Sequence, residues 1–345
     1  MENNELKTRI IKNVKENIAV SNIRKELDMD KFYKLVLAAC AVFVISAVII
    51  TNNNFLDNNF SKDYKEPNID DKLIVSSTDG IKIPKLKITE PSLTQETSMI
   101  SFIVYKGDMY VCTQIISIDK ANKLKGKYLG ETRPVYNEYL KSDYYKNATS
   151  TGLPHIEDFI QEKTKENPDI IWSIAESDKV YEVNGYSTDF RICCLDEINS
   201  QIIIYEKLNN ITVKYGKDLY EERLKLKENY EFVEYQYHQD WDNGKNNFKK
   251  FTEVTTEDIE QFIDEINNAE FIEGRNLDFY SIKKKQAHLY FRMKDGTTVN
   301  IRLNEDGYVS YSGWSARIFV KLDTETFRKI FNEAIPENYT YSDGK

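Results

Sequence analysis

The sequence predicts an α+β protein with one N-terminal transmembrane helix followed by two β-rich extracellular α+β modules, the second ordered helix, antiparallel meander, helix. Three observations lead to this prediction. An uncharged apolar run occupies residues 35–50, apolar and polar residues alternate in short segments from residue 81 onward, and two amphipathic helical patterns frame the last of these segments. The chain then divides into a cytoplasmic tail at 1–34, a transmembrane helix at 35–51, a polar stalk at 52–71, and modules at 72–225 and 226–345.

The apolar run reads LVLAACAVFVISAVII. With Phe32, Tyr33 and Thr51 as flanks it reaches roughly 20 residues, which is enough for a helix to cross about 30 Å of hydrocarbon. The alternatives are a buried core helix and a cleaved signal peptide. A signal peptide would have a shorter leader and small residues after the run, whereas three asparagines follow at 52–54. We therefore expect a permanent anchor.

The basic residues near this run predict its orientation, because Lys and Arg close to a span are retained on the cytoplasmic side. They are Arg24, Lys25, Lys31 and Lys34 before the run, and Lys62 and Lys65 after it. The sequence thus predicts a single-pass protein of the cell membrane, with a cytoplasmic N-terminus and extracellular C-terminal modules.

The tail carries an amphipathic helical pattern, in which Ile10, Ile11, Val14 and Ile18 fall close to one face. These four residues are the candidate partner-binding residues of the chain, as a docking surface for a cytoplasmic protein. The alternative is a basic segment that lies on anionic lipid.

The overall composition excludes one class of partner. The formal charge is −9 and the isoelectric point is about 5.2, whereas phosphate binding requires a basic face, so no nucleic-acid partner is expected. The 23 Tyr and 17 Phe residues favour folded modules over a disordered chain.

Three cysteines, Cys112, Cys193 and Cys194, fall outside the membrane in this topology, and Cys40 falls within the run. Neighbouring strand residues face opposite sides of a sheet, so at most one of Cys193 and Cys194 is placed to pair with Cys112. The alternative is that all three are small buried hydrophobic residues. The sequence contains no CxxC pair or Cys/His cluster, and no metal site is predicted.

In the first module, Pro84 marks an edge or bend within an alternating segment at 81–88. Segments 101–106 and 109–116 predict a hairpin around Gly107-Asp108, and residues 156–165 predict a helix. Further strands are expected at 180–185, 190–195 and 201–207.

In the second module, Thr255 and Asp258 form a capping-box pattern before an apolar helical stripe. Alternating segments then predict a meander with turns at Asp295-Gly296 and 304–307, and Asp323 is expected to cap a closing helix. This order predicts helices on one face of an antiparallel sheet.

No catalytic residue or cofactor is predicted. The histidines at 155, 238 and 288 are expected to be ordinary surface or strand residues, with His288 on the solvated face of its strand. The carboxylates at 240 and 242 are spaced as in a calcium loop, but the glycine comes one residue early, which favours a turn at Asn243-Gly244. Tyrosines could stack on sugars or a partner, or be half-buried strand residues; they are Tyr235, Tyr237, Tyr290, Tyr308 and Tyr311.

Five stretches of the sequence, which span most of residues 10–250, resemble a group of clostridial single-pass membrane proteins. They are NVKENIAVSNIRKEL in the tail, and IVYKGDMYVCTQ, LKGKYLGET, VYEVNGYSTDFRIC and YEKLNNITVKYGKDLY in the first module. Members of this group are described as anti-sigma-factor-like or sigma-associated membrane regulators. The resemblance implies a tail that restrains a cytoplasmic sigma factor or other regulator, and an exterior that senses a signal.

These observations predict a membrane-anchored extracytoplasmic sensor or regulator that is not an enzyme and that binds an unknown extracellular ligand. Two alternatives stay open. One is a surface-tethered ligand-binding or cell-wall-binding module without a signalling role, and the other is an extracellular hydrolase, which would need a cleft with titratable groups of shifted pKa.

The predicted topology can be tested by adding protease to intact cells. We expect the C-terminal modules to be removed while a cytoplasmic marker protein stays whole, because only the exterior is accessible. Immunoblots with epitope tags at either end follow the two parts. Complete protection of the C-terminal tag, or a mature chain that begins beyond Asn52, would contradict the prediction.

Overall fold

The structure is a computed structural model that describes residues 74–86, 101–121, 123–143, 156–173, 178–274, 284–313 and 316–335. All of these residues belong to one compact unit, Asn53–Lys345. Within these ranges, no helix is long and apolar enough to cross a membrane. The predicted tail, apolar run and stalk lie outside the described residues.

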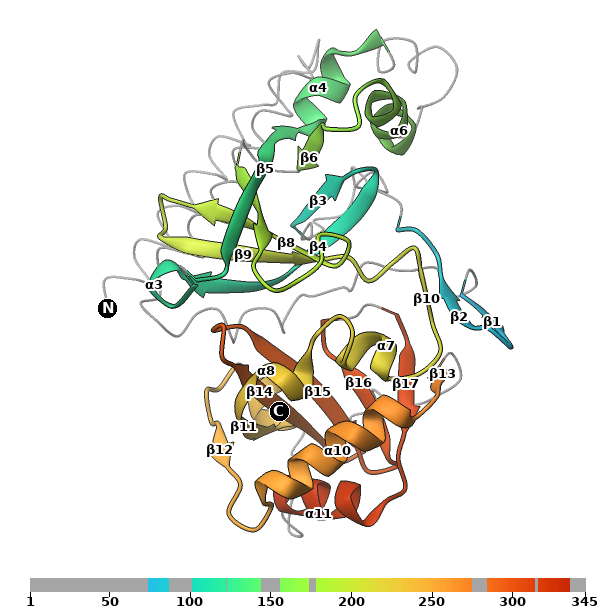
Figure 1. Cartoon of the computed structure of the whole chain (residues 1–345), viewed down its shortest axis with the longest axis vertical. Helices are drawn as coiled ribbons and strands as arrows, with labels where there is room; N and C mark the ends of the chain where they lie inside the picture. The colour runs from blue at the N-terminus through green and yellow to red at the C-terminus, as the bar shows by residue number, and fades with distance from the viewer. Residues whose placement is uncertain are drawn as a thin grey trace, which may run out of the picture. The chain divides into compact units, whose positions relative to one another are not determined.

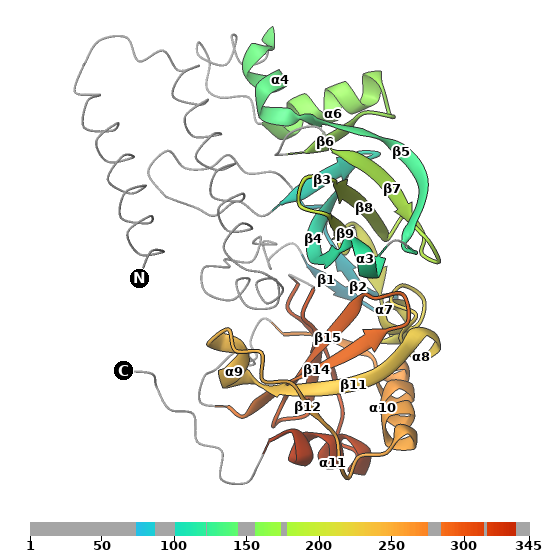
Figure 2. The ribbon, with the colours of Figure 1, turned by 90° about the vertical axis from the view of Figure 1, so that its left-hand side faces the viewer.

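Seven strands close into a barrel in the order β3-β4-β9-β8-β7-β5-β6 (Figure 1). The strands are β3 (Phe102–Tyr105), β4 (Asp108–Ser117), β5 (Lys125–Pro134), β6 (Ile171–Ser173), β7 (Lys179–Val183), β8 (Arg191–Asp196) and β9 (Gln201–Glu206). Strands β5 and β6 are parallel and the other pairs are antiparallel. Parallel strands need a crossover, and here it contains helices α4 (Val135–Lys141) and α6 (Ile156–Glu166), which lie together at one end of the barrel (Figure 2).

Alternation along the strands gives the barrel an inner core and an apolar outer patch. On β8, Ile192 and Cys194 belong to the inner cluster, whereas Cys193 belongs to a second cluster with Ile202 and Ile204. The short helix α3 (Ile118–Ala121) contributes Ile118 to that second cluster. The outer side of β8 and β9 is therefore covered as well.

The three described cysteines are free and buried. Cys112 and Cys194 share the inner cluster, but β9 runs between their strands, since Tyr205 pairs with Cys112 on one side and with Ile192 on the other. Two strand spacings amount to about 9–10 Å, beyond the ~7 Å that a disulfide spans between Cα atoms. Burial raises the pKa values of Cys112 and Cys193 to about 12. The thiols thus behave as buried apolar groups.

A small antiparallel sheet has the order β1-β2-β10, formed by β1 (Val75–Ser77), β2 (Gly80–Ile83) and β10 (Ile211–Val213). Gly80 has a φ of +123°, and a Cβ atom there would lie 2.6 Å from the Val213 carbonyl oxygen. Only glycine fits this position at the start of β2, directly after the turn from β1. Pro84, expected at an edge or bend, follows β2 directly.

The C-terminal region forms a seven-stranded antiparallel sheet in the order β12-β11-β14-β15-β16-β17-β13. Its strands are β11 (Tyr230–Tyr237), β12 (Lys249–Lys250), β13 (Phe271–Glu273), β14 (Gln286–Met293), β15 (Thr298–Asn304), β16 (Tyr308–Tyr311) and β17 (Ile318–Lys321). Its helices are α7 (Lys217–Tyr220), α8 (Leu226–Asn229), α9 (His238–Asp242), α10 (Thr256–Asn268) and α11 (Glu325–Ala334). In the sequence, α10 connects β12 with β13, which are the two edge strands of the sheet.

Helix α10 is built as its sequence predicts. Thr255 and Asp258 form a reciprocal capping box, and the predicted stripe of Ile259, Phe262, Ile263 and Ile266 is buried. The expected cap of α11 is wrong by one residue, because Thr324 rather than Asp323 accepts a hydrogen bond from the Phe327 N–H. The Glu333 carboxylate of α11 accepts N–H groups from residues 252–254 just before α10, which ties the two helices together.

The predicted fold class is wrong. We expected two α+β modules, the second ordered helix, meander, helix. The structure instead has a closed seven-stranded barrel and a seven-stranded antiparallel sheet. The sheet is wider than the predicted meander because three more strands belong to it. Strands β11 and β12 precede α10 in the sequence, and β13 follows α10. The prediction failed for the barrel because its closure depends on β6, a three-residue strand too short to show any periodicity. The predicted division at residues 225 and 226 stays a prediction.

A buried ion pair on the barrel accepts a hydrogen bond from the C-terminal sheet. The Arg191 guanidinium donates through Nε (3.0 Å) and Nη2 (2.5 Å) to Glu206 Oε1, and both side chains are fully buried. The Tyr311 hydroxyl, from β16, donates to Glu206 Oε2 at 2.8 Å. The guanidinium also stacks on the ring of Tyr186, whose hydroxyl donates to Asp295 Oδ2 at 2.8 Å. We call Arg191, Glu206 and Tyr311 the junction network.

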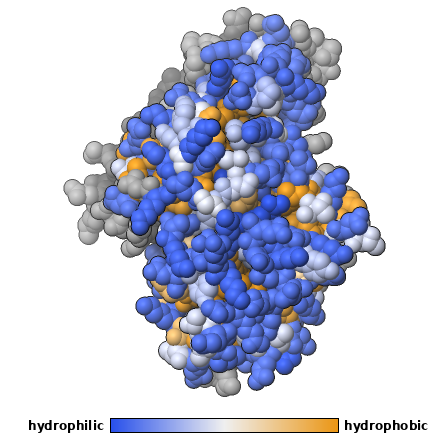
Figure 3. Space-filling view, viewed as in Figure 1, coloured by the Kyte–Doolittle hydropathy of each residue, from blue (hydrophilic) through white to orange (hydrophobic). Residues whose placement is uncertain are grey.

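The surface outside these clusters is mostly hydrophilic on the face shown in Figure 3. The large apolar side chains exposed within the described ranges are Val75, Tyr128, Ile198 and Phe232. Single exposed apolar residues are normal on folded proteins and do not by themselves mark a docking site.

Replacement Glu206→Gln should lower the free energy of unfolding by about 3 kcal/mol, because it leaves the buried Arg191 charge without a counter-ion. Denaturant unfolding measures this loss. Glu234→Gln is the matched control, since its partner Arg292 lies 3.1 Å away in a partly exposed pair, and it should cost about 1 kcal/mol or less. Equal losses in the two variants would show that the junction network carries no special constraint.

Candidate functional site

The face of the C-terminal sheet that alternates away from its apolar core carries polar side chains on β14 and β15. Ala287, Leu289 and Phe291 belong to the core. His288 alternates with them along β14 and therefore points to the other face. His288 was expected to be solvated there, but it is fully buried. It belongs to what we call the histidine cluster, made of His238, Trp241, His288, Asn300 and Arg302.

Helix α9 brings His238 and Trp241 over the sheet. It begins directly after β11, and its first residue lies beside β14 because Gln236 of β11 pairs with His288. The Trp241 and His288 rings stack with centroids 4.6 Å apart and planes 17° apart, and the two imidazole centroids are 5.3 Å apart. Asp240, which resembled a calcium ligand, instead bonds to Lys245 Nζ and Asn247 Nδ2.

Hydrogen bonds run through the cluster in one direction. Arg302 Nη2 lies 3.0 Å from His238 Nε2, His238 Nδ1 lies 3.0 Å from His288 Nε2, and His288 Nδ1 lies 3.2 Å from Asn300 Oδ1. A guanidinium can only donate and an amide oxygen can only accept. His238 therefore carries its proton on Nδ1 and donates to His288 Nε2, and His288 carries its proton on Nδ1 and donates to Asn300.

Both imidazoles are neutral near neutral pH. Burial, reinforced by the charge of Arg302, lowers the pKa of His238 to about 3. Burial, Arg302 and His238 hold the pKa of His288 well below its ordinary value. All four ring nitrogens are engaged in the chain, so neither imidazole can act as a base or metal ligand without breaking it. In the part of the chain that the structure describes, no group of three or more His, Cys, Asp or Glu residues is placed to hold a metal ion.

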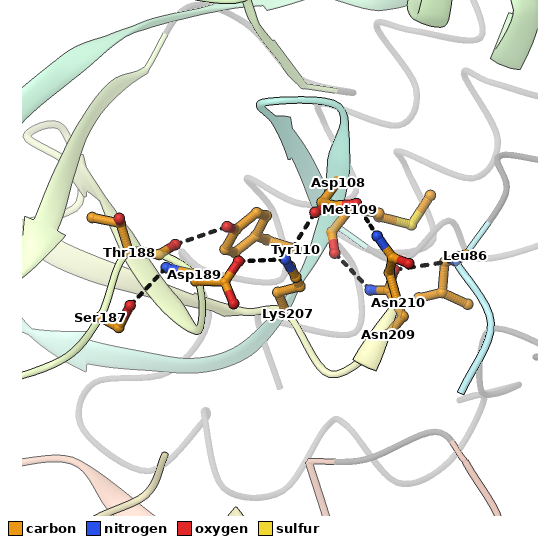
Figure 4. Close-up of polar contacts among 10 residues, drawn as sticks. All are labelled: Leu86, Asp108, Met109, Tyr110, Ser187, Thr188, Asp189, Lys207, Asn209 and Asn210. Atoms are coloured by element: carbon orange, nitrogen blue, oxygen red, sulfur yellow. Dashed lines mark hydrogen bonds and ion pairs between the residues drawn. The ribbon is translucent and has the colours of Figure 1, made fainter. Parts of the chain in front are cut away.

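A second polar cluster surrounds Lys207, which follows β9 (Figure 4). Lys207 Nζ lies 2.8 Å from Asp108 Oδ2 and 2.5 Å from Asp189 Oδ1. Burial opposes the charge of this amine, but the hydrogen bonds to Asp108 and Asp189 outweigh it and raise the pKa of Lys207. Since the amine is charged and held by two carboxylates, it is not available as a nucleophile.

Neighbouring side chains extend this cluster into the backbone (Figure 4). Asn209 is fully buried, donates to the Met109 carbonyl at 2.8 Å and accepts from the Leu86 N–H at 3.1 Å. The Tyr110 hydroxyl donates to the Thr188 carbonyl at 2.7 Å. The cluster thus fastens the β3–β4 turn, the segment before β8 and the exit of β9 to one another. Its role is to hold the barrel.

The β3–β4 turn itself differs from the prediction by one residue. Lys106 and Gly107 occupy the turn, with φ values of 52° and 81°, and Asp108 already belongs to β4. Two central residues with positive φ form the turn type that matches the twist of a two-residue hairpin. Asp108 is thereby brought to the strand end, where Lys207 reaches it.

The candidate partner-binding residues Ile10, Ile11, Val14 and Ile18 lie outside the described residues, as does His155. Of the five tyrosines considered above, Tyr235, Tyr290 and Tyr311 are buried and the other two are half-buried. Sequence reasoning missed the histidine cluster. Its one signal was the run of polar residues at alternate positions of β14 and β15, which is also typical of a solvated face.

No family model, no curated protein and no solved structure matches this chain.

Replacement Lys207→Met should lower the free energy of unfolding by about 1–3 kcal/mol, because Asp108 and Asp189 lose their shared counter-ion. Lys179→Met is the matched control on the same barrel, since its pair with Glu197 at 3.1 Å is exposed to solvent and should contribute little to stability. Urea unfolding followed by circular dichroism compares the two. A Lys207 variant no less stable than the control would rule out the fastening role.

Proposed function

We propose that this protein is a single-pass, membrane-anchored extracytoplasmic sensor or regulator that acts by binding and not by catalysis. The anchor is the apolar segment at 35–51, and the basic residues before it favour a cytoplasmic N-terminus. The C-terminal part then faces the exterior and meets a ligand there.

The junction network is the observation that carries this proposal. Arg191 and Glu206 of the barrel and Tyr311 of the sheet share one fully buried hydrogen-bonded site. Separating barrel and sheet would keep the Arg191–Glu206 pair but would remove the Tyr311 hydrogen bond and the cover that excludes water from the pair. Barrel and sheet therefore respond together to a ligand on either one, as a sensor requires.

Binding is favoured over catalysis by how the reactive side chains are used. All ring nitrogens of His238 and His288 take part in the hydrogen-bond chain. The described cysteine thiols are buried, and burial raises their pKa values. A general base or thiolate nucleophile needs a free lone pair near neutral pH. These groups support the fold instead.

On the cytoplasmic side, we propose that Ile10, Ile11, Val14 and Ile18 contact a sigma factor or another regulator, as in the group of proteins that the sequence resembles. A signal carried by one helix must change oligomerisation, the helix position or its susceptibility to proteolysis. In each case, the ligand must bind with different affinities to the signalling and the non-signalling state of the protein.

The tail can be tested with a matched pair of double variants in the full-length chain. Val14→Glu with Ile18→Glu places two charges on the apolar face, whereas Asn13→Glu with Ala19→Glu places them off it. We expect the first pair to reduce the cross-linked cytoplasmic partner at least about tenfold, because burying charge in an apolar contact is unfavourable. The second pair should leave it unchanged.

Cross-linking in cells with mass spectrometry, together with transcript profiling, measures the outcome. If both double variants capture the same proteins as the parent chain and leave transcription unaltered, the signalling role is lost. The tethered binding module would then account for the chain, and exchange of residues 1–30 for an unrelated basic peptide should preserve its function.

A further inference from the structure

We infer that residues 238–248, which begin with α9 and which we call the lid, form a proton-operated latch that closes on the sheet at neutral pH and opens in acid. The inference deepens the proposed function by naming the hydrogen ion as an external signal, and it rests on that function only for the claim that opening is transmitted.

Besides the hydrogen bonds of His238, ring contacts and a backbone contact between described residues hold the lid closed. Trp241 stacks on His288, and Phe248 meets Tyr290 edge-on, with centroids 4.8 Å apart and planes 85° apart. The Gln236 side chain of β11 donates to the Lys245 carbonyl. These contacts involve the polar face of the sheet, and no residue of the lid belongs to the described apolar clusters, so the lid can be released without loss of the barrel or the apolar core.

The hydrogen-bond chain excludes any further proton while the lid is closed. Every gap between Arg302 and Asn300 already contains one hydrogen. A solvent proton added to His288 Nε2 would face the His238 Nδ1–H across 3.0 Å, and one added to His238 Nε2 would face the Arg302 guanidinium at the same distance. Two donors then oppose each other, so the closed state cannot take up the proton.

Opening removes this conflict, since solvated imidazoles accept a proton with an ordinary pKa of about 6.5. Below that pH, each further decrease of one pH unit raises the ratio of open to closed lid about tenfold per histidine, or about a hundredfold for two histidines. At about pH 4.5 the ratio has risen roughly 10⁴-fold. The sign follows from the lowered pKa values: the closed lid is favoured above the ordinary pKa and loses this advantage as the pH falls.

Among the residues that the structure describes, the other charged and titratable groups around the lid come from the strands packed against it and from the lid itself. They are Asp240, Asp242 and Lys245 in the lid, Glu234 and Tyr237 on β11, Lys249 on β12, Tyr290 and Arg292 on β14, and Arg302 on β15. The histidine variants described below separate a transition of the two imidazoles from one of these other groups.

The test labels the full-length chain, in detergent micelles, with 5-fluorotryptophan and follows the fluorine NMR spectrum from about pH 7.5 to about pH 4.5. Trp241→Phe and Trp314→Phe assign the resonances and leave Trp172, which is buried in the apolar core, as the reporter of global unfolding. We expect the Trp241 signal to move to a solvent-exposed position with the steepness of two protons, while the Trp172 signal stays fixed.

A double variant, His238→Gln with His288→Gln, should lack this transition, and His155→Gln should keep it. If the double variant does not fold, His288→Asn serves instead, and the steepness should drop to one proton. An unmoved Trp241 signal, a joint transition of Trp241 and Trp172, or an unaltered transition in the histidine variants would each overturn the lid. None of these measurements involves the tail, so their failure is distinct from failure of the proposed partner contact.

Discussion

A charge pair buried between β8 and β9 is the constraint on which the described part of the chain depends. Arg191 and Glu206 alternate to the outer side of the barrel, where an unpaired charge would be costly, so each needs the other and both need cover. Tyr186 and Tyr311 give that cover, the first by ring stacking and the second by a hydrogen bond from β16. The barrel is therefore complete only when the sheet lies against it.

The histidine cluster uses polar atoms differently. Arg302 at one end and Asn300 at the other set the direction of every hydrogen bond between them, so two neutral imidazoles occupy a buried site without an unsatisfied ring nitrogen. Lys207 achieves the same satisfaction with two carboxylates at a barrel turn. The histidine cluster keeps two imidazoles neutral beside the charged Arg302, whereas the Lys207 cluster keeps both its amine and its carboxylates charged. This difference is the basis on which we propose acid sensitivity for the first cluster and a structural role for the second.

Much of the local structure could be predicted from the sequence. The capping box at Thr255, the stripe of α10 and the alternation of β14 and β15 depend on neighbours within a few residues, and the structure has them. The fold class could not be predicted, because β6 pairs in parallel with β5 across a long crossover and carries only three residues. The histidine cluster was missed because His238 and His288 are 50 positions apart, and buried polar residues on alternate positions look the same as solvated ones.

The place of α10 in the sheet has a consequence for biosynthesis. This helix joins β12 to β13, the two rims of the sheet, and the strands that fill the space between β11 and β13 are encoded after it. Both rims thus leave the ribosome before β14–β17, and β13 cannot find its neighbour until β17 has been made. The sheet can therefore close only after β17 has been synthesised, so β11 and β13 stay without their neighbours β14 and β17 until the last part of the chain is made.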